Sequence, residues 1–134
     1  MERPKDNGEI KTEACRAYAR MMNNLDYSGF EPWLTEDFHY ASQWVCEEIT
    51  SKAAFAAYIV PKLQTIKNSG NRVWAEIAYA ETLGAGPCVV LAQGDPDDLE
   101  ATLLISMRDE MISRADLCCI PRPEDCGRTG EIPT

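Results

Sequence analysis

The sequence predicts an α+β domain in which three N-terminal helices pack on one face of a curved, mostly antiparallel sheet. Two observations carry this prediction. Apolar residues recur at helical spacing through the first half of the chain, interrupted by one aromatic-rich strand. After the segment NSGN, residues 68–71, the apolar period changes from 3.6 to 2 and stays there to about residue 120. Helices followed by a run of strands are typical of α+β domains.

The first predicted helix begins near Thr12, a residue type that caps helix N-termini. Its apolar residues follow at i, i+3, i+7 and i+10, which places them on one face. They are Cys15, Tyr18, Met22 and Leu25.

Two further helices complete the N-terminal half. After the turn DYSG, Ser28 and Glu31 have the spacing of a capping box and predict a short second helix. Ser51 is expected to cap the third helix, KAAFAAYIVPKLQTIK. Pro61 lies well inside that helix and should kink it or split it in two.

The strands are indicated by alternation of apolar and polar residues. In FHYASQWV, residues 38–45, the side chains of Phe38, Tyr40, Ser42 and Trp44 share one face, and His39 lies on the other. Four further strands are expected at residues 72–81, 87–94, 99–107 and 110–120.

The chain is short enough for a single domain, which we place at residues 11–121. Residues 1–10 are polar and are expected to be flexible. Residues 122–134 are rich in Pro, Gly and charge, and are expected to lie extended over the surface.

Composition narrows the function classes. The formal net charge of −9 argues against nucleic-acid binding, which needs clustered cations. No apolar run approaches the ~20 residues of a membrane span, and the polar N-terminus does not resemble a secretory signal, so a cytoplasmic protein without a membrane partner is expected. Six cysteines without a CxxC pair and a single histidine predict reduced thiols and neither a metal site nor a cofactor.

Two charges interrupt the last predicted strand. Arg114 and Asp116 lie two residues apart in MISRADLCC, so both project to one face. A tight two-residue turn before this strand would pair Leu103 with Asp116 and place both charges among the more apolar residues, under the helices. The neighbouring turns lack the Asn-Gly or Asp-Gly signature that fixes a hairpin, so a slip of one residue, which reverses the faces, stays open. An inward pair is either a structural ion pair or the polar wall of a cavity.

The order, lengths and patterns of these elements resemble the nuclear transport factor 2-like superfamily, whose cone-shaped, cystatin-like α+β fold is shared by ketosteroid isomerases and SnoaL-like polyketide cyclases. The resemblance covers the chain from Thr12 to Pro121. It is carried by ACRAYARMMNNLDYSGFEPWLTEDFHY, by the helix after Ser51 and by the hairpin LLISMRDEMISRADLCC. More narrowly, YASQWV, KLQTIKNSG and PCVVLAQGD resemble a group of bacterial proteins of this fold without an assigned role.

The resemblance implies a test against the ketosteroid isomerase mechanism. Tyr18 matches the tyrosine that donates a hydrogen bond to the developing enolate oxygen. The general-base aspartate would fall at Ser42, which cannot take a proton at neutral pH. The protonated aspartate of the oxyanion hole would fall at Leu103, which has no carboxyl group. Two missing groups of three argue against steroid isomerisation by that mechanism, although Asp116, predicted at nearly the depth of Leu103, offers a relocated carboxylate.

In this fold the concave sheet face and the helices enclose a pocket with apolar walls and a few polar groups, as small-molecule sites have. An isomerase-, cyclase- or dehydratase-like enzyme acting on a small apolar or weakly acidic molecule would use Asp116 as acid or base and Tyr18 as oxyanion donor. A non-catalytic binder of such a molecule and a protein-interaction module remain as alternatives. Each aromatic residue by itself is more often a core residue than a catalytic one. The predicted lining, besides Tyr18, Met22 and Asp116, consists of Arg114, Tyr40, Ser42, Trp44, Tyr58, Trp74, Leu103 and Cys118.

The same register predicts an apolar patch on the outer face of the sheet. Exposed apolar patches commonly mark interfaces, so a two-fold homodimer through this face is expected. The patch is predicted to include Val89, Leu91, Leu104 and Leu117.

Overall fold

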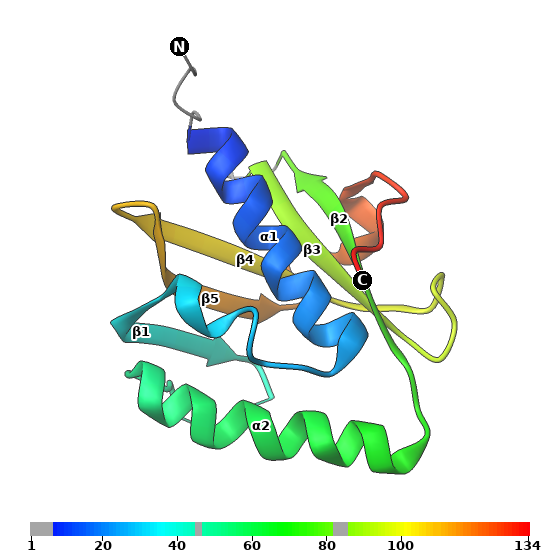
Figure 1. The fold of residues 1–134 in the computed structure, drawn as a ribbon. Coiled ribbons are helices and arrows are strands. Elements are labelled where there is room, and N and C mark those ends of the chain that lie inside the picture. Colours follow the sequence, from blue (N-terminus) through cyan, green and yellow to red (C-terminus); the bar gives the residue numbers. More distant parts are fainter. Residues whose placement is uncertain (1–6, 45–46, 82–85) are drawn as a thin grey trace.

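The computed structural model describes residues 7–44, 47–81 and 86–134. This part of the chain forms an α+β fold with two α-helices and one six-stranded sheet (Figure 1). Its helices are α1 (Asn7–Asn24) and α2 (Lys52–Ser69). Its strands are β1 (Leu34–Ser42), β2 (Val73–Ala80), β3 (Gly86–Gln93), β4 (Leu99–Arg108), β5 (Met111–Cys118) and β6 (Gly127–Arg128). The expectations for residues 1–6, Val45 and Cys46 fall outside the described residues.

Helix α1 buries the apolar face that its spacing predicts. Cys15, Tyr18 and Met22 are at most 6% exposed, and Leu25 packs against the same core. The helix begins earlier than expected, at Asn7, so residues 7–10 are helical. Thr12 is therefore no cap: its hydroxyl donates to the Gly8 carbonyl one turn back, at 2.8 Å.

The predicted second helix is only a single 3-10 turn, Glu31–Trp33, so the sheet carries two helices and not three. Ser28 does not form the expected capping box, because its backbone N–H and its hydroxyl both donate to the carboxylate of Asp26, at 3.0 and 2.8 Å. Such local side-chain bonds compete with helix initiation. The backbone is already extended at Leu34, where β1 begins.

Helix α2 begins and ends as predicted but is not broken. The Ser51 hydroxyl accepts from the Ala54 backbone N–H at 3.0 Å, and Gly70 closes the helix in the left-handed conformation at φ 74°. Pro61 lies inside a continuous helix and is exposed, so water can hydrate the carbonyl that loses its proline partner. Of the two predicted effects of Pro61, a kink or a split, the split into two helices is wrong.

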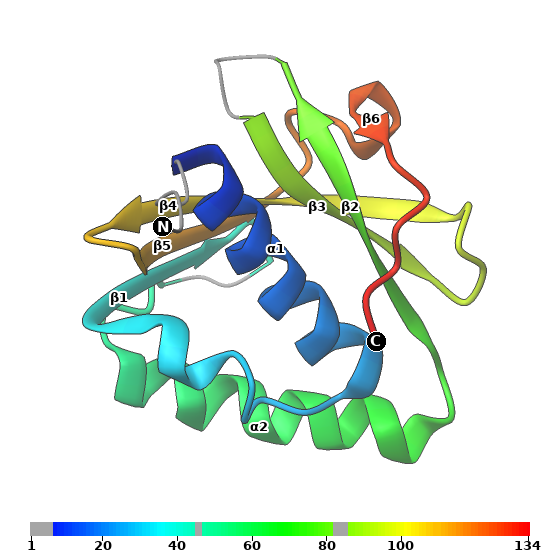
Figure 2. The same ribbon diagram turned by 45° about the horizontal axis from the view of Figure 1, so that its top comes forward.

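The strands form one mixed sheet in the order β1-β5-β4-β3-β2-β6, antiparallel except where β1 runs parallel to β5. Helix α1 packs on β2 and β3, whereas α2 packs beside β1 (Figures 1 and 2). The face that contacts the helices is the inner face. Phe38 and Tyr40 of β1 belong to it, as their alternation predicts, and His39 lies on the outer face.

The hairpin between β4 and β5 corrects the predicted register. It closes by the expected two-residue turn, with Met107 opposite Ile112. A bulge then shifts the pairing by one, so that Asp116 lies opposite Leu104 instead of Leu103. Because one extra residue moves every later side chain to the other face, Arg114, Asp116 and Cys118 lie on the outer face. The inward placement of these three residues is wrong.

The pairing of β3 with β4 is also one residue from the prediction, since Val90 lies opposite Thr102. Val89, Leu91 and Leu117 consequently belong to the main core on the inner face, and only Leu104 of the predicted outer patch lies outside it. The homodimer remains a prediction, but the outer-face patch predicted as its interface does not exist as such, because three of its four residues are in the core.

The core has two parts. The larger lies between the helices and the inner face, around Phe30, Phe38, Phe55, Leu103 and Ile112. The smaller lies on the outer face and is completed by Cys126 from the C-terminal tail. In the described residues, every cysteine is a free thiol and no helix is long and apolar enough to cross a bilayer.

The C-terminal tail does more than lie extended on the surface. It forms a 3-10 turn, Pro123–Asp125, and then β6, which extends the sheet beside β2. Beyond β6 the backbone continues along β2 toward the end of α1 (Figure 2). There the Asn23 amide donates to the Ala75 and Pro133 carbonyls at 2.9 and 2.6 Å.

Candidate functional site

A cavity of about 450 Å³ lies between the two helices and the inner face of the sheet. Helix α1 and strand β1 provide an aromatic end, α2 provides one long wall, and β3 and β4 provide the other. The cavity is partly open to solvent. Its apolar lining is Tyr18, Met22, Tyr40, Trp44, Ile59, Ile66, Val73, Leu91, Ala92, Ala101 and Leu117.

The aromatic end holds three phenols. The rings of Tyr40 and Tyr58 are 5.6 Å apart, and Tyr18 packs edge-on against Phe30 at 5.5 Å. Burial, together with the neighbouring Tyr40 and Tyr58, raises the pKa of Tyr18 well above its usual range. Among the described residues none hydrogen bonds to the Tyr18 hydroxyl. The Tyr18 hydroxyl is thus protonated, lines the cavity, and can donate a hydrogen bond to a bound ligand.

Tyr40 lies beside Tyr58 and Ser42. Burial raises its pKa above the usual range, Tyr58 adds to the shift, and a hydrogen bond from Ser42 opposes it. The Ser42 hydroxyl also accepts from the Trp44 backbone N–H at 3.2 Å. Trp44 is 58% exposed and lines the cavity, so its ring lies at the cavity mouth.

Lys62 of α2 brings a cation to this end. Its ammonium donates to the Tyr58 hydroxyl at 3.0 Å and lies 5.3 Å from the centre of the Tyr58 ring. The pair is four residues apart on the helix, which is the spacing that brings side chains together.

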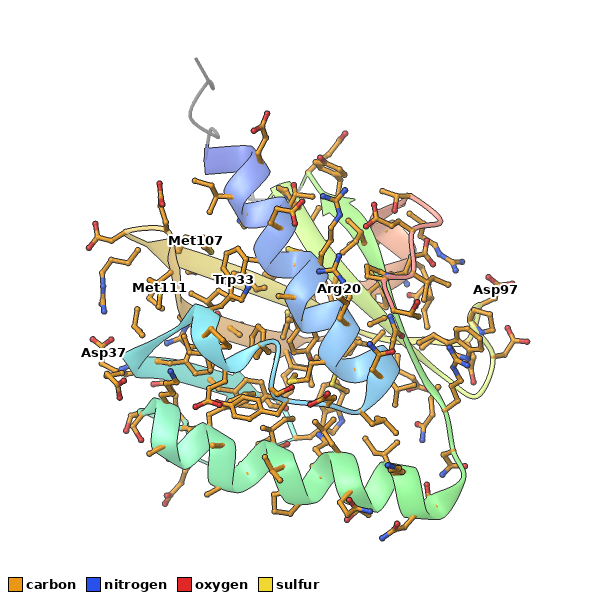
Figure 3. The ribbon with its side chains drawn as sticks, in the orientation of Figure 1. Arg20, Trp33, Asp37, Asp97, Met107 and Met111 are labelled. Atoms are coloured by element: carbon orange, nitrogen blue, oxygen red, sulfur yellow. The ribbon has the colours of Figure 1, made fainter. Side chains whose placement is uncertain are left out.

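The opposite end of the cavity has hydroxyl, amide and carboxylate groups instead of phenols and an ammonium. Ser69 is the last residue of α2 and Asn71 follows the helix, while Gln93 and Glu100 flank the turn between β3 and β4. That turn carries Asp97, which Figure 3 shows far from Met107 and Met111 at the other end of β4 and β5. The described residues contain no cluster of His, Cys, Asp and Glu able to hold a metal ion.

The predicted site residues divide into three groups. Tyr18, Met22, Tyr40 and Trp44 line the cavity. Ser42 and Tyr58 do not line it but hydrogen bond to residues that do or to Lys62. The third group lies elsewhere: Leu103 is fully buried in the core, and the Trp74 indole donates to the Gly94 carbonyl at 3.0 Å under the Arg72 guanidinium.

Arg114 and Asp116 form an ion pair on the outer face. Two guanidinium nitrogens contact the carboxylate at 2.9 to 3.1 Å, and a third reaches Glu48 at 2.6 Å. Hydrogen bonding by Asp116 raises the pKa of Arg114. Both side chains are about one-third exposed, at 38% and 33%, so the pair is a partly exposed structural contact and not a cavity wall.

Cys118 lies beside this pair and is a poor nucleophile. Burial raises the pKa of its thiol, and the neighbouring Asp116 carboxylate raises it further. A thiol becomes reactive when its surroundings favour the thiolate, and these surroundings oppose it.

Sequence reasoning missed the polar residues of the two walls. Lys62, Gln93 and Glu100 line the cavity, yet none of them belongs to an apolar stripe. For Lys62 a signal existed, since it follows the predicted lining residue Tyr58 by one helical turn. Gln93 shares the face of Leu91 by alternation, and the incorrect register predicted for β3 and β4 placed that face outside. For Glu100 no comparable signal exists, because it is the extra residue where the pairing shifts between Leu91–Ala101 and Ala92–Leu99.

No protein-family model and no curated protein matches the chain. Solved structures do match, and three are representative. A candidate polyketide cyclase from Xanthomonas campestris is 22% identical, with a TM-score of 0.58 over 84% of this chain and 91% of its own. A protein of unknown function from Mesorhizobium loti, described as NTF2-like, is 14% identical, with a TM-score of 0.64 over 87% and 95%. A candidate ketosteroid isomerase from Kribbella flavida is 19% identical, with a TM-score of 0.57 over 81% and 76%. At these identities the likeness shows the fold, which is nuclear transport factor 2-like.

Proposed function

We propose that this protein binds a small, mainly apolar molecule in the cavity under α1 and α2. One observation carries the proposal: a cavity of about 450 Å³ with apolar walls has the buried Tyr18 phenol in its lining, without a hydrogen-bond partner among the described residues. Small-molecule sites commonly measure ~300–1,000 Å³ and combine apolar walls with a few polar groups. A carbonyl or carboxylate oxygen on the ligand would accept the Tyr18 hydrogen bond.

The experiment is a titration with N-phenyl-1-naphthylamine, a neutral dye whose fluorescence rises in apolar sites. Two cavity-filling variants, Thr65→Phe from α2 and Ala101→Leu from β4, should weaken binding at least tenfold, because both positions line the cavity. Ala57→Phe adds a ring to an exposed position of α2 and should leave binding unchanged. Thr65 is itself exposed, so its variant should fold even if Ala101→Leu does not. The proposal would be overturned if the wild type does not bind the dye. It would also be overturned if Thr65→Phe and Ala101→Leu bind the dye as tightly as the wild type and Ala57→Phe.

A second candidate is a cofactor-independent isomerase- or cyclase-like enzyme using the same cavity. The position of two phenols, Tyr18 and Tyr40, in the cavity lining favours it, since a protonated phenol can donate to an oxyanion that develops during the reaction. Polyketide cyclase and ketosteroid isomerase are the activities for which two of the matching structures are named as candidates.

This chemistry also needs a base, and Asp116 lies on the outer face. Glu100 is the carboxylate that lines the cavity within the described residues. The test is incubation with an unconjugated β,γ-enone, followed by the ultraviolet absorbance of the conjugated product. Turnover that Glu100→Gln and Tyr18→Phe abolish, while dye binding persists, would support the enzyme. Binding without turnover would leave the non-catalytic binder.

A further inference from the structure

The position of Lys62 gives the cavity a charge preference. Its ammonium lies at the aromatic end, with the Tyr58 hydroxyl at 3.0 Å as its hydrogen-bond acceptor. A neutral phenol satisfies one of the three ammonium donors and none of the charge. Among the described residues, Lys62 makes no ion pair with a carboxylate, and it is the basic residue that lines this cavity.

The chain has 22 acidic residues and 13 basic ones, and Lys62 is the basic residue without a carboxylate partner that lines the cavity in the described part of the chain. Arg16, Arg108 and Arg128 each contact at least one carboxylate at 3.0 Å or less. Lys62 instead donates to the Tyr58 hydroxyl and lines the cavity. A cation kept beside an apolar cavity, in a protein this acidic, is suited to a negatively charged group on a ligand.

Glu100 does not cancel this preference, because it lies at the other end. Ser69 lines the Glu100 end of the cavity and follows Lys62 by seven residues on α2, a helical rise of ~10 Å. Glu100 is also exposed, so water screens its charge. The cavity therefore has a cationic aromatic end and an amide and carboxylate end.

Resting on the proposed binding function, we propose that the ligand is an amphipathic anion: an apolar body with one carboxylate or comparable anionic group. The anion lies against the Lys62 ammonium, within reach of the phenols, and the apolar body extends between Ile59 and Ile66 on the α2 wall and Leu91 on the β3 wall. Lys62 is then the residue that sets ligand charge.

The test compares two dyes that share one aromatic body. N-phenyl-1-naphthylamine is neutral, and 8-anilinonaphthalene-1-sulfonate adds a sulfonate that stands in for the ligand's anion. Lys62→Met keeps the apolar stem of the side chain and removes the charge. It should weaken binding of the sulfonate dye about tenfold and change binding of the neutral dye less than twofold.

Two matched variants separate the site from general charge effects. Lys67→Met removes an exposed charge from the same helix outside the cavity lining and should leave both dyes unaffected. Lys62→Arg keeps the charge and should retain sulfonate binding. Near-ultraviolet circular dichroism confirms native packing, because loosened proteins also bind the sulfonate dye. If Lys62→Met fails this check, Lys62→Gln replaces it.

The outcomes separate the two proposals. The charge preference would be overturned if the neutral dye binds but Lys62→Met does not change the affinity for the sulfonate dye. It would also be overturned if Lys67→Met lowers that affinity as much as Lys62→Met does. In both cases the binding function would still stand. Failure of both dyes to bind the wild type would overturn both proposals. Loss of sulfonate binding confined to Lys62→Met would support both.

Discussion

At the scale of single residues, the separation of the ion pair from the cavity has a direct consequence. Asp116→Asn should leave binding of N-phenyl-1-naphthylamine unchanged, because Asp116 faces away from the helices. Stability should fall by less than ~1 kcal/mol, since the pair is partly exposed and Arg114 keeps Glu48 as a partner. Dye titration and urea unfolding measure the two effects. A large loss of binding with unchanged stability would mean that this carboxylate reaches the cavity.

A second residue carries an unsatisfied group. The Tyr27 hydroxyl is buried without a hydrogen-bond partner among the described residues, while its ring packs on Phe55 at 5.9 Å. Tyr27→Phe keeps the ring and removes the hydroxyl, so the free energy of unfolding should rise by ~1 kcal/mol. Urea unfolding measures the change, with Tyr79→Phe as the exposed control that should change nothing. A loss of stability in Tyr27→Phe would show that the hydroxyl is satisfied after all.

Residue-level prediction worked where a regular element carried the side chain. Tyr18 and Met22 follow from helical spacing on α1, and Tyr40 follows from alternation on β1. Arg114 and Asp116 were misplaced because alternation was continued through the β5 bulge. With the bulge included, Ile112, Ala115 and Leu117 are the buried residues of β5.

At the scale of elements, the turn between β4 and β5 is strained. Asp109 and Glu110 have φ values of 52° and 65°, the left-handed conformation that a two-residue hairpin turn requires. Asp tolerates this region better than Glu, which has no short side chain to support it. Glu110→Gly should therefore raise the free energy of unfolding by ~0.5–1 kcal/mol.

Thermal unfolding and urea unfolding both measure this change. Glu110→Ala is the control, because it removes the same charge but keeps a β-carbon in the left-handed region, and it should give no gain. Equal stabilisation by both variants would attribute the effect to charge. The sequence predicted the length of this turn and the first pair beyond it, Met107 with Ile112, but not the bulge that follows in β5, which no turn residue signals.

Element prediction failed at one more place for a local reason. The short second helix is a 3-10 turn because Asp26 captures Ser28 before a capping box can form. Ser51 makes no side-chain bond of this kind within the described residues and caps α2 as expected. The same residue type thus predicts a helix start only where neighbouring side chains do not offer it another bond.

At the scale of the whole molecule, the C-terminal tail closes the edge of the sheet through one buried charge. Glu76 of β2 is 4% exposed, and its carboxylate accepts from the Arg128 guanidinium at 2.8 and 3.2 Å and from the Gly130 backbone N–H at 2.9 Å. Composition showed this tail only as Pro- and Gly-rich. Its docking depends on contacts between residues about 50 apart in the sequence, which no local pattern reveals.

Arg128→Met should lower the free energy of unfolding by ~2 kcal/mol, because it leaves the Glu76 carboxylate buried without its cation. The cost stays below that of a fully buried pair, since Arg128 is itself one-third exposed and water can reach it. Arg122→Met breaks the exposed pair with Asp125 in the same tail and should cost little. Urea unfolding compares the two variants, and Glu76→Gln in the Arg128→Met background should recover part of the loss. Equal, small losses for both arginines would mean that the tail adds no stability through this charge, and that the smaller core around Cys126 is what holds it to the sheet.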